Sequence, residues 1–325
     1  MNSGLSHILI FYLIFFIFIS LSFSLILIPY VKKIGTKFDF LDGINSRNLK
    51  NKSVVRIGGL GIFLGYSLSY LLILQTGFIN SFYLLPLFFG SIMMFLLGIT
   101  DDLIQLSPYL RLVFQILIAT YVFSSGISIE NIDLSYFGVN NFIINLPDTL
   151  SYLITIFWLV GITNAINWFD GIDGLASSIV AISTLGIIFL SIRSGNIESA
   201  YFACVMLGSN LGFLKYNIRP ASIYMGDGGS YLIGFILASL SITANSNSSQ
   251  VLVPHLAILI LLLPITDMSI VIFKRIFSGK SPFLPDKNHI HHRLLANGLN
   301  ESKVLCFLCL INLFLIFLAL LTFKN

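Results

Sequence analysis

The 325-residue sequence has few charged side chains, and this scarcity excludes most soluble proteins. Only 10% of its residues are Asp, Glu, Lys or Arg, whereas soluble domains carry about 25%. Hydrophobic residues make up 56% of the chain, which is more than a soluble fold can cover. The composition therefore predicts a polytopic membrane protein, and it excludes a disordered chain and a nucleic-acid-binding protein.

Cysteine is also scarce, with three residues that all lie in apolar runs, Cys204, Cys306 and Cys309. The spacing of the last two matches a redox pair, but a thiolate between such neighbours would lie in hydrocarbon. We interpret all three as ordinary membrane-helix cysteines, so no disulfide framework is expected.

Long apolar runs predict an all-α fold with about ten transmembrane helices in one domain, residues 1–325. No Lys or Arg precedes Lys32, so the first run is expected to be a membrane helix and not a cleavable signal. Alternation around a glycine-containing turn predicts a small external β-hairpin near 127–145. The predicted spans are 6–29, 58–75, 82–99, 110–126, 150–163, 174–192, 199–214, 229–244, 251–272 and 303–322.

The charges separate the two sides of this topology. Of the 18 Lys and Arg residues, 16 fall in alternate loops, which the positive-inside rule assigns to the cytoplasm. Both termini are then outside. Ten of the 14 acidic residues lie in or beside the same five loops, 31–57, 100–111, 164–173, 215–228 and 273–303. Carboxylates gathered at one face predict a site at the cytoplasmic surface rather than a conduit through the bilayer.

Two adjacent carboxylates, Asp101 and Asp102, end the third predicted span, and Arg111 opens the fourth. Neighbouring carboxylates repel each other unless a cation or a proton is present, so the pair indicates a metal-rich or proton-accepting site. The alternative is that the two residues are interfacial caps that only end the helix.

A second group of polar residues is spaced by three along the chain: Asn164, Asn167, Asp170 and Asp173. On a helix they would form one drifting stripe, although the glycine after each aspartate predicts that the helix breaks near Asp170. Such oxygen-bearing side chains suit Mg²⁺.

A third group, from Tyr224 to Ser230, enters the eighth predicted span and contains Asp227 among glycines. Glycines let the backbone approach a ligand closely, and the N–H groups at a helix start favour phosphate. The alternative is a plain turn. An earlier glycine-rich run at 58–65 resembles a nucleotide fingerprint, but its place in an apolar span predicts close helix packing instead.

The fourth group is His289, His291, His292 and Arg293, in the largest basic loop. Three histidines could bind zinc, but no cysteine is near and the basic neighbours favour an anion such as a diphosphate. The alternative is a solvated basic surface.

In this order and on one side of the membrane, the four groups resemble the motifs of the polyprenyl-phosphate N-acetylhexosamine-1-phosphate transferase superfamily, glycosyltransferase family 4. The resemblance covers about residues 42–299. The histidine group is similar to that of the bacterial undecaprenyl-phosphate N-acetylglucosamine-1-phosphate transferase-like branch, whereas the phospho-N-acetylmuramoyl-pentapeptide branch carries a different block. The first loop departs from the family pattern, because Lys50 replaces a histidine and Ser53 and Val55 replace prolines.

The resemblance implies transfer of a HexNAc-1-phosphate from a UDP-amino-sugar to undecaprenyl phosphate, which releases UMP and initiates a surface glycan such as O-antigen or teichoic acid. It implies a bacterial inner (plasma) membrane enzyme with a cytoplasmic active site and Mg²⁺ as cofactor, with Mn²⁺ as the alternative ion. UDP-GlcNAc is the default donor, and UDP-QuiNAc, UDP-FucNAc and UDP-MurNAc-pentapeptide are alternatives. A homodimer is left open. The rival functions are a transporter and an inactive scaffold of the same family.

The resemblance also implies roles for individual residues. Asp227 and Asn167 would hold Mg²⁺, while Asp101, supported by Asp102, would position or deprotonate the acceptor phosphate. Asp170 and Asp173 complete the predicted catalytic set by ordering the second loop, and a direct in-line attack is preferred to a phospho-aspartate intermediate. The predicted substrate-binding residues are Tyr224, which would stack on uracil, and Asn164, Arg111, Arg56, His289, His291, His292 and Arg293.

Overall fold

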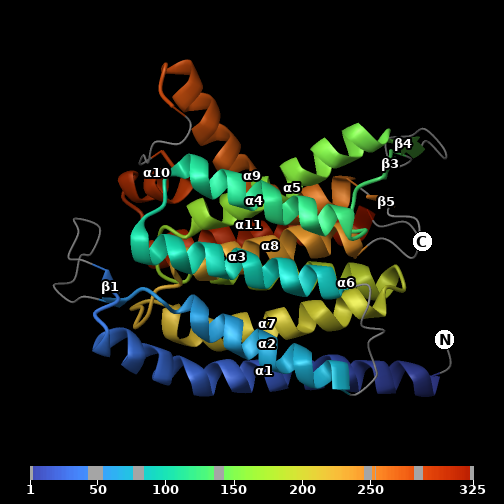
Figure 1. Cartoon of the computed structure of the whole chain (residues 1–325), viewed down its shortest axis with the longest axis horizontal. Coiled ribbons are helices and arrows are strands. Elements are labelled where there is room, and N and C mark those ends of the chain that lie inside the picture. The colour runs from blue at the N-terminus through green and yellow to red at the C-terminus, as the bar shows by residue number, and fades with distance from the viewer. Residues whose placement is uncertain are drawn as a thin grey trace.

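Helices that run side by side make up the molecule (Figure 1). The computed structural model describes residues 3–42, 54–75, 84–134, 143–244, 251–252, 254–281 and 288–322. The helices are α1 (Ser3–Lys37), α2 (Gly59–Gln75), α3 (Leu85–Ile104), α4 (Pro108–Ser124), α5 (Asp148–Phe169), α6 (Leu175–Arg193), α7 (Ile197–Asn217), α8 (Gly226–Thr243), α9 (Pro254–Phe277), α10 (Ile290–Ala296) and α11 (Glu301–Thr322).

Each predicted span coincides with one of the long helices, so the all-α polytopic fold is confirmed. Among the described residues, seven helices are long and apolar enough to cross a membrane, and α2 and α4 are shorter apolar helices of 17 residues. The number of crossings and their orientation stay predictions. Helix α1 differs most from its predicted range, because its polar C-terminal end continues beyond the apolar run.

Helix α8 lies at the centre of the bundle. Every residue from Gly228 to Thr243 is buried, and α8 packs against α2, α3, α5 and α6. A helix that is apolar on all sides is stable only when other helices surround it. The outer helices α1 and α11 instead expose large apolar side chains, such as Phe18 and Phe314, which form a surface suited to lipid.

The glycines of α2 let it approach its neighbours closely. A Cβ atom at Gly61 or Gly65 would meet Ile28 or Ser24 of α1, and one at Gly59 would meet Gly229 of α8. Small residues at such contacts let helix backbones come together in a membrane. The glycine-rich run is therefore a packing surface, as predicted, and not a nucleotide fingerprint.

A small sheet lies at the same end of the bundle as both termini (Figure 1). Strand β3 (Asn131–Asp133) pairs antiparallel with β4 (Ile143–Asn145), which confirms the predicted hairpin, although its turn lies outside the described residues. A third strand, β5 (Val251–Leu252), pairs parallel with β3. The sequence placed 251–252 in a membrane span, and this was wrong because α9 begins only at Pro254.

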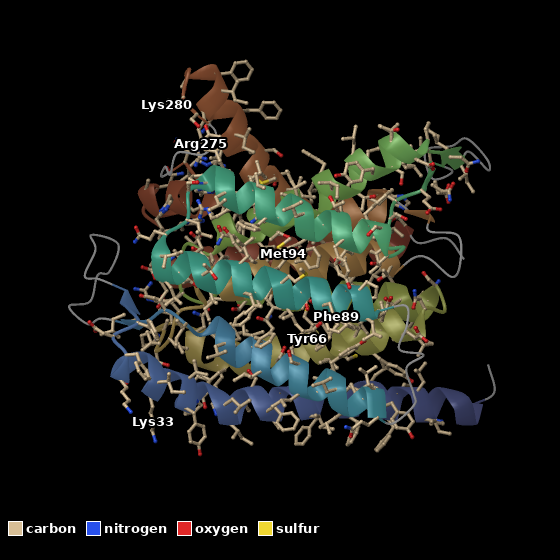
Figure 2. All side chains as sticks on the ribbon, in the orientation of Figure 1. Lys33, Tyr66, Phe89, Met94, Arg275 and Lys280 are labelled. Carbon is tan, nitrogen blue, oxygen red and sulfur yellow. The ribbon has the colours of Figure 1, made fainter. Side chains whose placement is uncertain are left out.

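The opposite end carries α10 and a two-stranded ladder of β1 (Leu41–Asp42) and β2 (Val54–Val55). Figure 2 places the basic side chains Lys33, Arg275 and Lys280 at this end as well. The long helices thus separate a basic end from the end that holds both termini, as the charge pattern predicts.

The contact between α3 and α8 is tight at Gly98, where an added Cβ atom would lie 2.7 Å from the Cα of Gly228. We expect Gly98→Ala to destabilise the bundle by about 1–3 kcal/mol, because packed backbone cannot yield. The matched control is Gly161→Ala in α5, where nothing lies within 4 Å. Thermal unfolding in detergent should show a lower melting temperature for Gly98→Ala alone, and equal melting temperatures would contradict this packing.

Candidate active site

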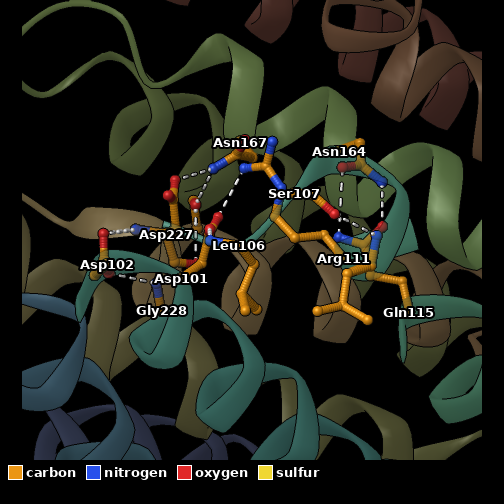
Figure 3. A network of polar contacts seen from close by, with 12 residues as sticks. Asp101, Asp102, Leu106, Ser107, Arg111, Gln115, Asn164, Asn167, Asp227 and Gly228 are labelled. Atoms are coloured by element: carbon orange, nitrogen blue, oxygen red, sulfur yellow. Dashed lines mark hydrogen bonds and ion pairs between the residues drawn. The ribbon is translucent and has the colours of Figure 1, made fainter. Parts of the chain in front are cut away.

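The C-terminal end of α3 meets the N-terminal end of α8 through the side chain of Asp102 (Figure 3). Its Oδ1 accepts the backbone N–H of Asp227 at 2.9 Å, and its Oδ2 accepts that of Gly228 at 3.0 Å. A carboxylate at a helix N-terminus satisfies N–H groups that the helix leaves unpaired and opposes the helix dipole. Asp102 therefore caps the N-terminus of α8. The sequence left open that Asp102 is a helix cap, but for the end of its own helix, α3.

This cap corrects one expectation about phosphate. The sequence predicted that N–H groups at the start of the eighth span would favour a phosphate ligand, but two of them already bind Asp102. The approach requires a glycine at position 226, which has a positive φ of 73°. A Cβ atom there would lie 2.6 Å from Asp102 Oδ2.

Asp227 is the carboxylate that stays accessible in this cluster, with 19% of its side chain exposed against 2% for Asp102. Its Oδ1 accepts a 2.7 Å hydrogen bond from Asn167 Nδ2, which also donates to Ser230 at 2.8 Å. Its Oδ2 lies 3.3 Å from Arg56 Nη2, and the same guanidinium lies 3.2 Å from Asp102 through Nε. The structure thus brings the predicted metal residues Asp227 and Asn167 into contact.

Asp170 follows the last turn of α5, close to this cluster. The helix ends at Phe169, as the sequence predicted. Burial raises the pKa of Asp170 to about 7, and the nearby Asp227 carboxylate adds to this effect while Arg56 opposes it. Asp170 thus lies in a buried position near the Asp227 carboxylate.

Asp101 is 4% exposed and points to different partners than Asp102 does. Its Oδ2 lies 2.7 Å from Arg111 Nη1, and its Oδ1 accepts the backbone N–H of Leu106 at 2.8 Å. Ser107 caps α4, so Arg111 lies one turn inside a helix whose start is fixed. The structure thus pairs Asp101 directly with Arg111, a contact that the sequence did not predict.

Two of the predicted residues contact neighbouring helices or loops. Asn164 donates to Gln115 Oε1 of α4 at 2.6 Å and to the carbonyl of Val160 at 2.8 Å. Asp173 accepts the backbone N–H of Ala221 at 2.9 Å, which ties the loop after α5 to the loop before α8. Neither residue contacts Asp227 through these bonds. Asn164 joins α5 to α4, and Asp173 joins two loops beside the site.

The histidine group packs on the loop after α5. His291 is 1% exposed, and its ring lies against Gly171 and 6.4 Å from the ring of Phe169. The ring of His292 lies 4.3 Å from that of His291, and both His292 and Arg293 are half-buried on α10. The fourth sequence group therefore joins the second one, and through Asn167 and Asp227 all four groups meet.

Tyr224, the first residue of the third group, is hydrogen-bonded through its backbone to the end of the first loop. Its N–H donates to Val55 at 2.8 Å, and its carbonyl accepts from Gly58 at 2.8 Å. Arg56 is thereby held beside α8. Lys50, Ser53 and the rest of 43–53 lie outside the described residues. Among the residues that are described, no group of three or more His, Cys, Asp or Glu side chains is arranged to hold a metal ion.

Sequence reasoning missed several residues that support the site. Asn217 Oδ1 accepts the N–H of Gly174, and its Nδ2 donates to the carbonyl of Ile223, so it fixes two loops at once. Gln115 contacts the predicted residue Asn164 from α4, whose sequence indicates only an apolar span. Asp267 is a carboxylate near the inner end of a predicted span, and this position alone could have marked it as a candidate site residue.

Comparison with known proteins identifies the family of this chain. Residues 84–245 match the family model described as glycosyl transferase family 4. The chain is 35% identical to a probable undecaprenyl-phosphate N-acetylglucosaminyl 1-phosphate transferase of Bacillus subtilis, over 87% of this chain and 77% of that protein.

Two other relatives widen the range of names. A decaprenyl-phosphate N-acetylglucosaminephosphotransferase of Mycobacterium leprae is 33% identical over 77% of this chain and 68% of that protein. A phospho-N-acetylmuramoyl-pentapeptide-transferase of Prochlorococcus marinus is 32% identical over 93% of this chain and 88% of that protein. The chain therefore belongs to glycosyl transferase family 4, in the superfamily of polyprenyl-phosphate N-acetylhexosamine-1-phosphate transferases.

Proposed function

We propose that the protein transfers a HexNAc-1-phosphate from a UDP-amino-sugar to undecaprenyl phosphate and releases UMP at the cytoplasmic face of the bacterial plasma membrane. The observation that carries the proposal is the accessible Asp227 carboxylate, which Asn167 and Arg56 hold at the start of α8. Arg111 is paired with Asp101, and His291 of the histidine group packs on the loop after α5. Such a combination of carboxylates and cations suits a diphosphate.

The donor atoms around Asp227 fit Mg²⁺. This ion takes hard oxygen ligands and keeps several waters, and it usually needs only one or two protein carboxylates beside the substrate phosphates. Asp227 would hold it, with Asp170 close by, and Asn167 would join by turning its amide oxygen to the ion, because its Nδ2 donates to Asp227 in the structure. When bound, the ion would neutralise the donor diphosphate and polarise its phosphorus–oxygen bonds. Mn²⁺, which prefers the same ligands, is the alternative ion.

The chain's own residues would orient the reactants for a direct in-line attack. Both oxygens of Asp101 are engaged by Arg111 and the N–H of Leu106, so this carboxylate is better suited to hold Arg111 than to act as a nucleophile. Arg111 would bind the acceptor phosphate, and Arg56 and the histidine group would neutralise charge that develops on the donor. The second pKa of a phosphate monoester is about 6, so little proton removal is needed.

The most direct test is an assay of UMP release by the purified protein with undecaprenyl phosphate, Mg²⁺ and a panel of UDP-sugars. We expect UDP-GlcNAc to be used, because the relatives from Bacillus and Mycobacterium are named for N-acetylglucosamine. The panel should include UDP-QuiNAc, UDP-FucNAc and UDP-MurNAc-pentapeptide, since one relative is named for the pentapeptide donor. No UMP release from any donor would contradict the proposal and favour a scaffold or a transporter.

Tyr224 is expected to stack on the uracil ring, because it precedes by three residues Asp227, the residue proposed to hold the ion that binds the diphosphate. Tyr224→Phe keeps the ring and should be nearly silent. Tyr224→Ala should raise the KM for the UDP-sugar about tenfold, which corresponds to about 1.4 kcal/mol. Steady-state kinetics with each substrate varied separately would check this. An unchanged donor KM in Tyr224→Ala, or equal damage from Phe, would contradict stacking.

The proposed orientation can be tested without activity. In a chain whose three native cysteines are replaced by alanine, a cysteine at Lys280, at the basic end, should be shielded from a membrane-impermeant thiol reagent in intact cells. A cysteine at Asn145, in exposed strand β4, should be labelled. Labelling of the Lys280 site from outside would reverse the assignment of the site to the cytoplasm.

A further inference from the structure

A buried carboxylate that the proposed mechanism does not use lies on α9. Asp267 is 2% exposed and is part of a helix long and apolar enough to cross a membrane. Its Oδ2 lies 2.7 Å from Nδ1 of His289, and its Oδ1 accepts the backbone N–H of Ile290 at 2.6 Å. A carboxylate buried in an apolar helix costs free energy, so the groups that it contacts indicate its role.

The contact with Asp267 determines which ring nitrogen of His289 is available to a ligand. An ionised carboxylate only accepts hydrogen bonds, so Nδ1 of His289 carries a proton and donates it to Asp267. The ring nitrogen that remains for a ligand is Nε2. A phosphate oxygen that approached Nε2 would therefore meet a ring that Asp267 holds from the Nδ1 side.

Aromatic neighbours hold the same ring in place. His289 stacks on His291 at 5.6 Å with 10° between the ring planes, and the edge of Trp168 meets it at 6.1 Å. The guanidinium of Arg275 lies 5.0 Å above the ring of Trp168. His291 in turn contacts Gly171, the residue after Asp170. Asp267 thus starts a chain of contacts that ends at Gly171, the residue next to Asp170.

We propose that Asp267 is a positioning residue that fixes the tautomer and orientation of His289 so that Nε2 faces the phosphates of the donor. This inference rests on the proposed function, since it deepens the role of a predicted substrate-binding histidine. It differs from a purely structural role, in which Asp267 would only anchor α10 through Ile290.

A double-mutant cycle separates the two roles. Asp267→Asn keeps an oxygen for the Ile290 N–H but turns an amide NH₂ toward Nδ1. We expect kcat/KM for the UDP-sugar to fall about 10- to 100-fold, the range for losing a carboxylate that orients a functional histidine. His289→Gln should lose a similar factor, and the double variant should be no worse than His289→Gln alone. The positioning role would be overturned if the two single losses in kcat/KM multiplied in the double variant, or if Asp267→Asn kept wild-type activity.

The tautomer gives a readout that anchoring would not change. In ¹⁵N spectra of histidine-labelled protein, with His289→Gln used for assignment, wild-type His289 should carry its proton on Nδ1. Asp267→Asn should move it to Nε2. The matched control is Glu301→Gln, which removes a carboxylate paired with Arg219 at 2.9 Å beside α10 and should leave the tautomer unchanged.

The outcomes distinguish this inference from the proposed function. If the wild-type protein releases no UMP with any donor, the proposed function fails while the spectra still decide how Asp267 holds His289. A wild-type Nε2–H tautomer would overturn the positioning role even if Asp267→Asn did not fold. Turnover by the wild type with an unchanged tautomer in Asp267→Asn would contradict the inference alone.

Discussion

The contact on which the site depends is the cap that Asp102 of α3 places on the N-terminus of α8. It joins two segments 125 residues apart in the chain, and Arg56 from the first loop forms an ion pair with the same carboxylate. Because α8 is buried along nearly its whole length, its orientation is fixed by the bundle. The cap then determines where Asp227, one residue into the helix, presents its carboxylate.

The rest of the site follows from the cost of gathering carboxylates. Asp102, Asp227 and Asp170 lie close together, and one guanidinium, that of Arg56, contacts the first two. Burial is the main cause of the raised pKa of Asp170, and the Asp227 carboxylate adds electrostatic repulsion. A divalent cation brought by a diphosphate would relieve it, so substrate and cation would bind together. Two other buried carboxylates have their own partners. Asp101 is paired with the guanidinium of Arg111, and Asp267 with Nδ1 of His289.

The sequence predicted the helices well, because apolar runs and their polar ends are local properties. It also predicted the break after Phe169 from the glycines that follow, and the hairpin of β3 and β4 from alternation. It could not predict β5, which pairs with β3 across 120 residues, nor assign different roles to Asp101 and Asp102. Adjacent residues on a helix point in different directions, and their partners lie far away in the chain. The catalytic, metal-binding and substrate-binding roles of the predicted residues stay predictions, although the structure brings the four groups together.

The measurement that tests this account most directly compares Asp102→Asn with Asp227→Asn for both thermal unfolding and UMP release. The account predicts that Asp102→Asn lowers the melting temperature, because hydrogen bonds to a buried charge are worth about 1.5–3 kcal/mol. Asp227→Asn should keep a melting temperature near that of the wild type and lose at least about 100-fold in turnover at saturating Mg²⁺. The reverse pattern, a stable Asp102→Asn and an active Asp227→Asn, would contradict it.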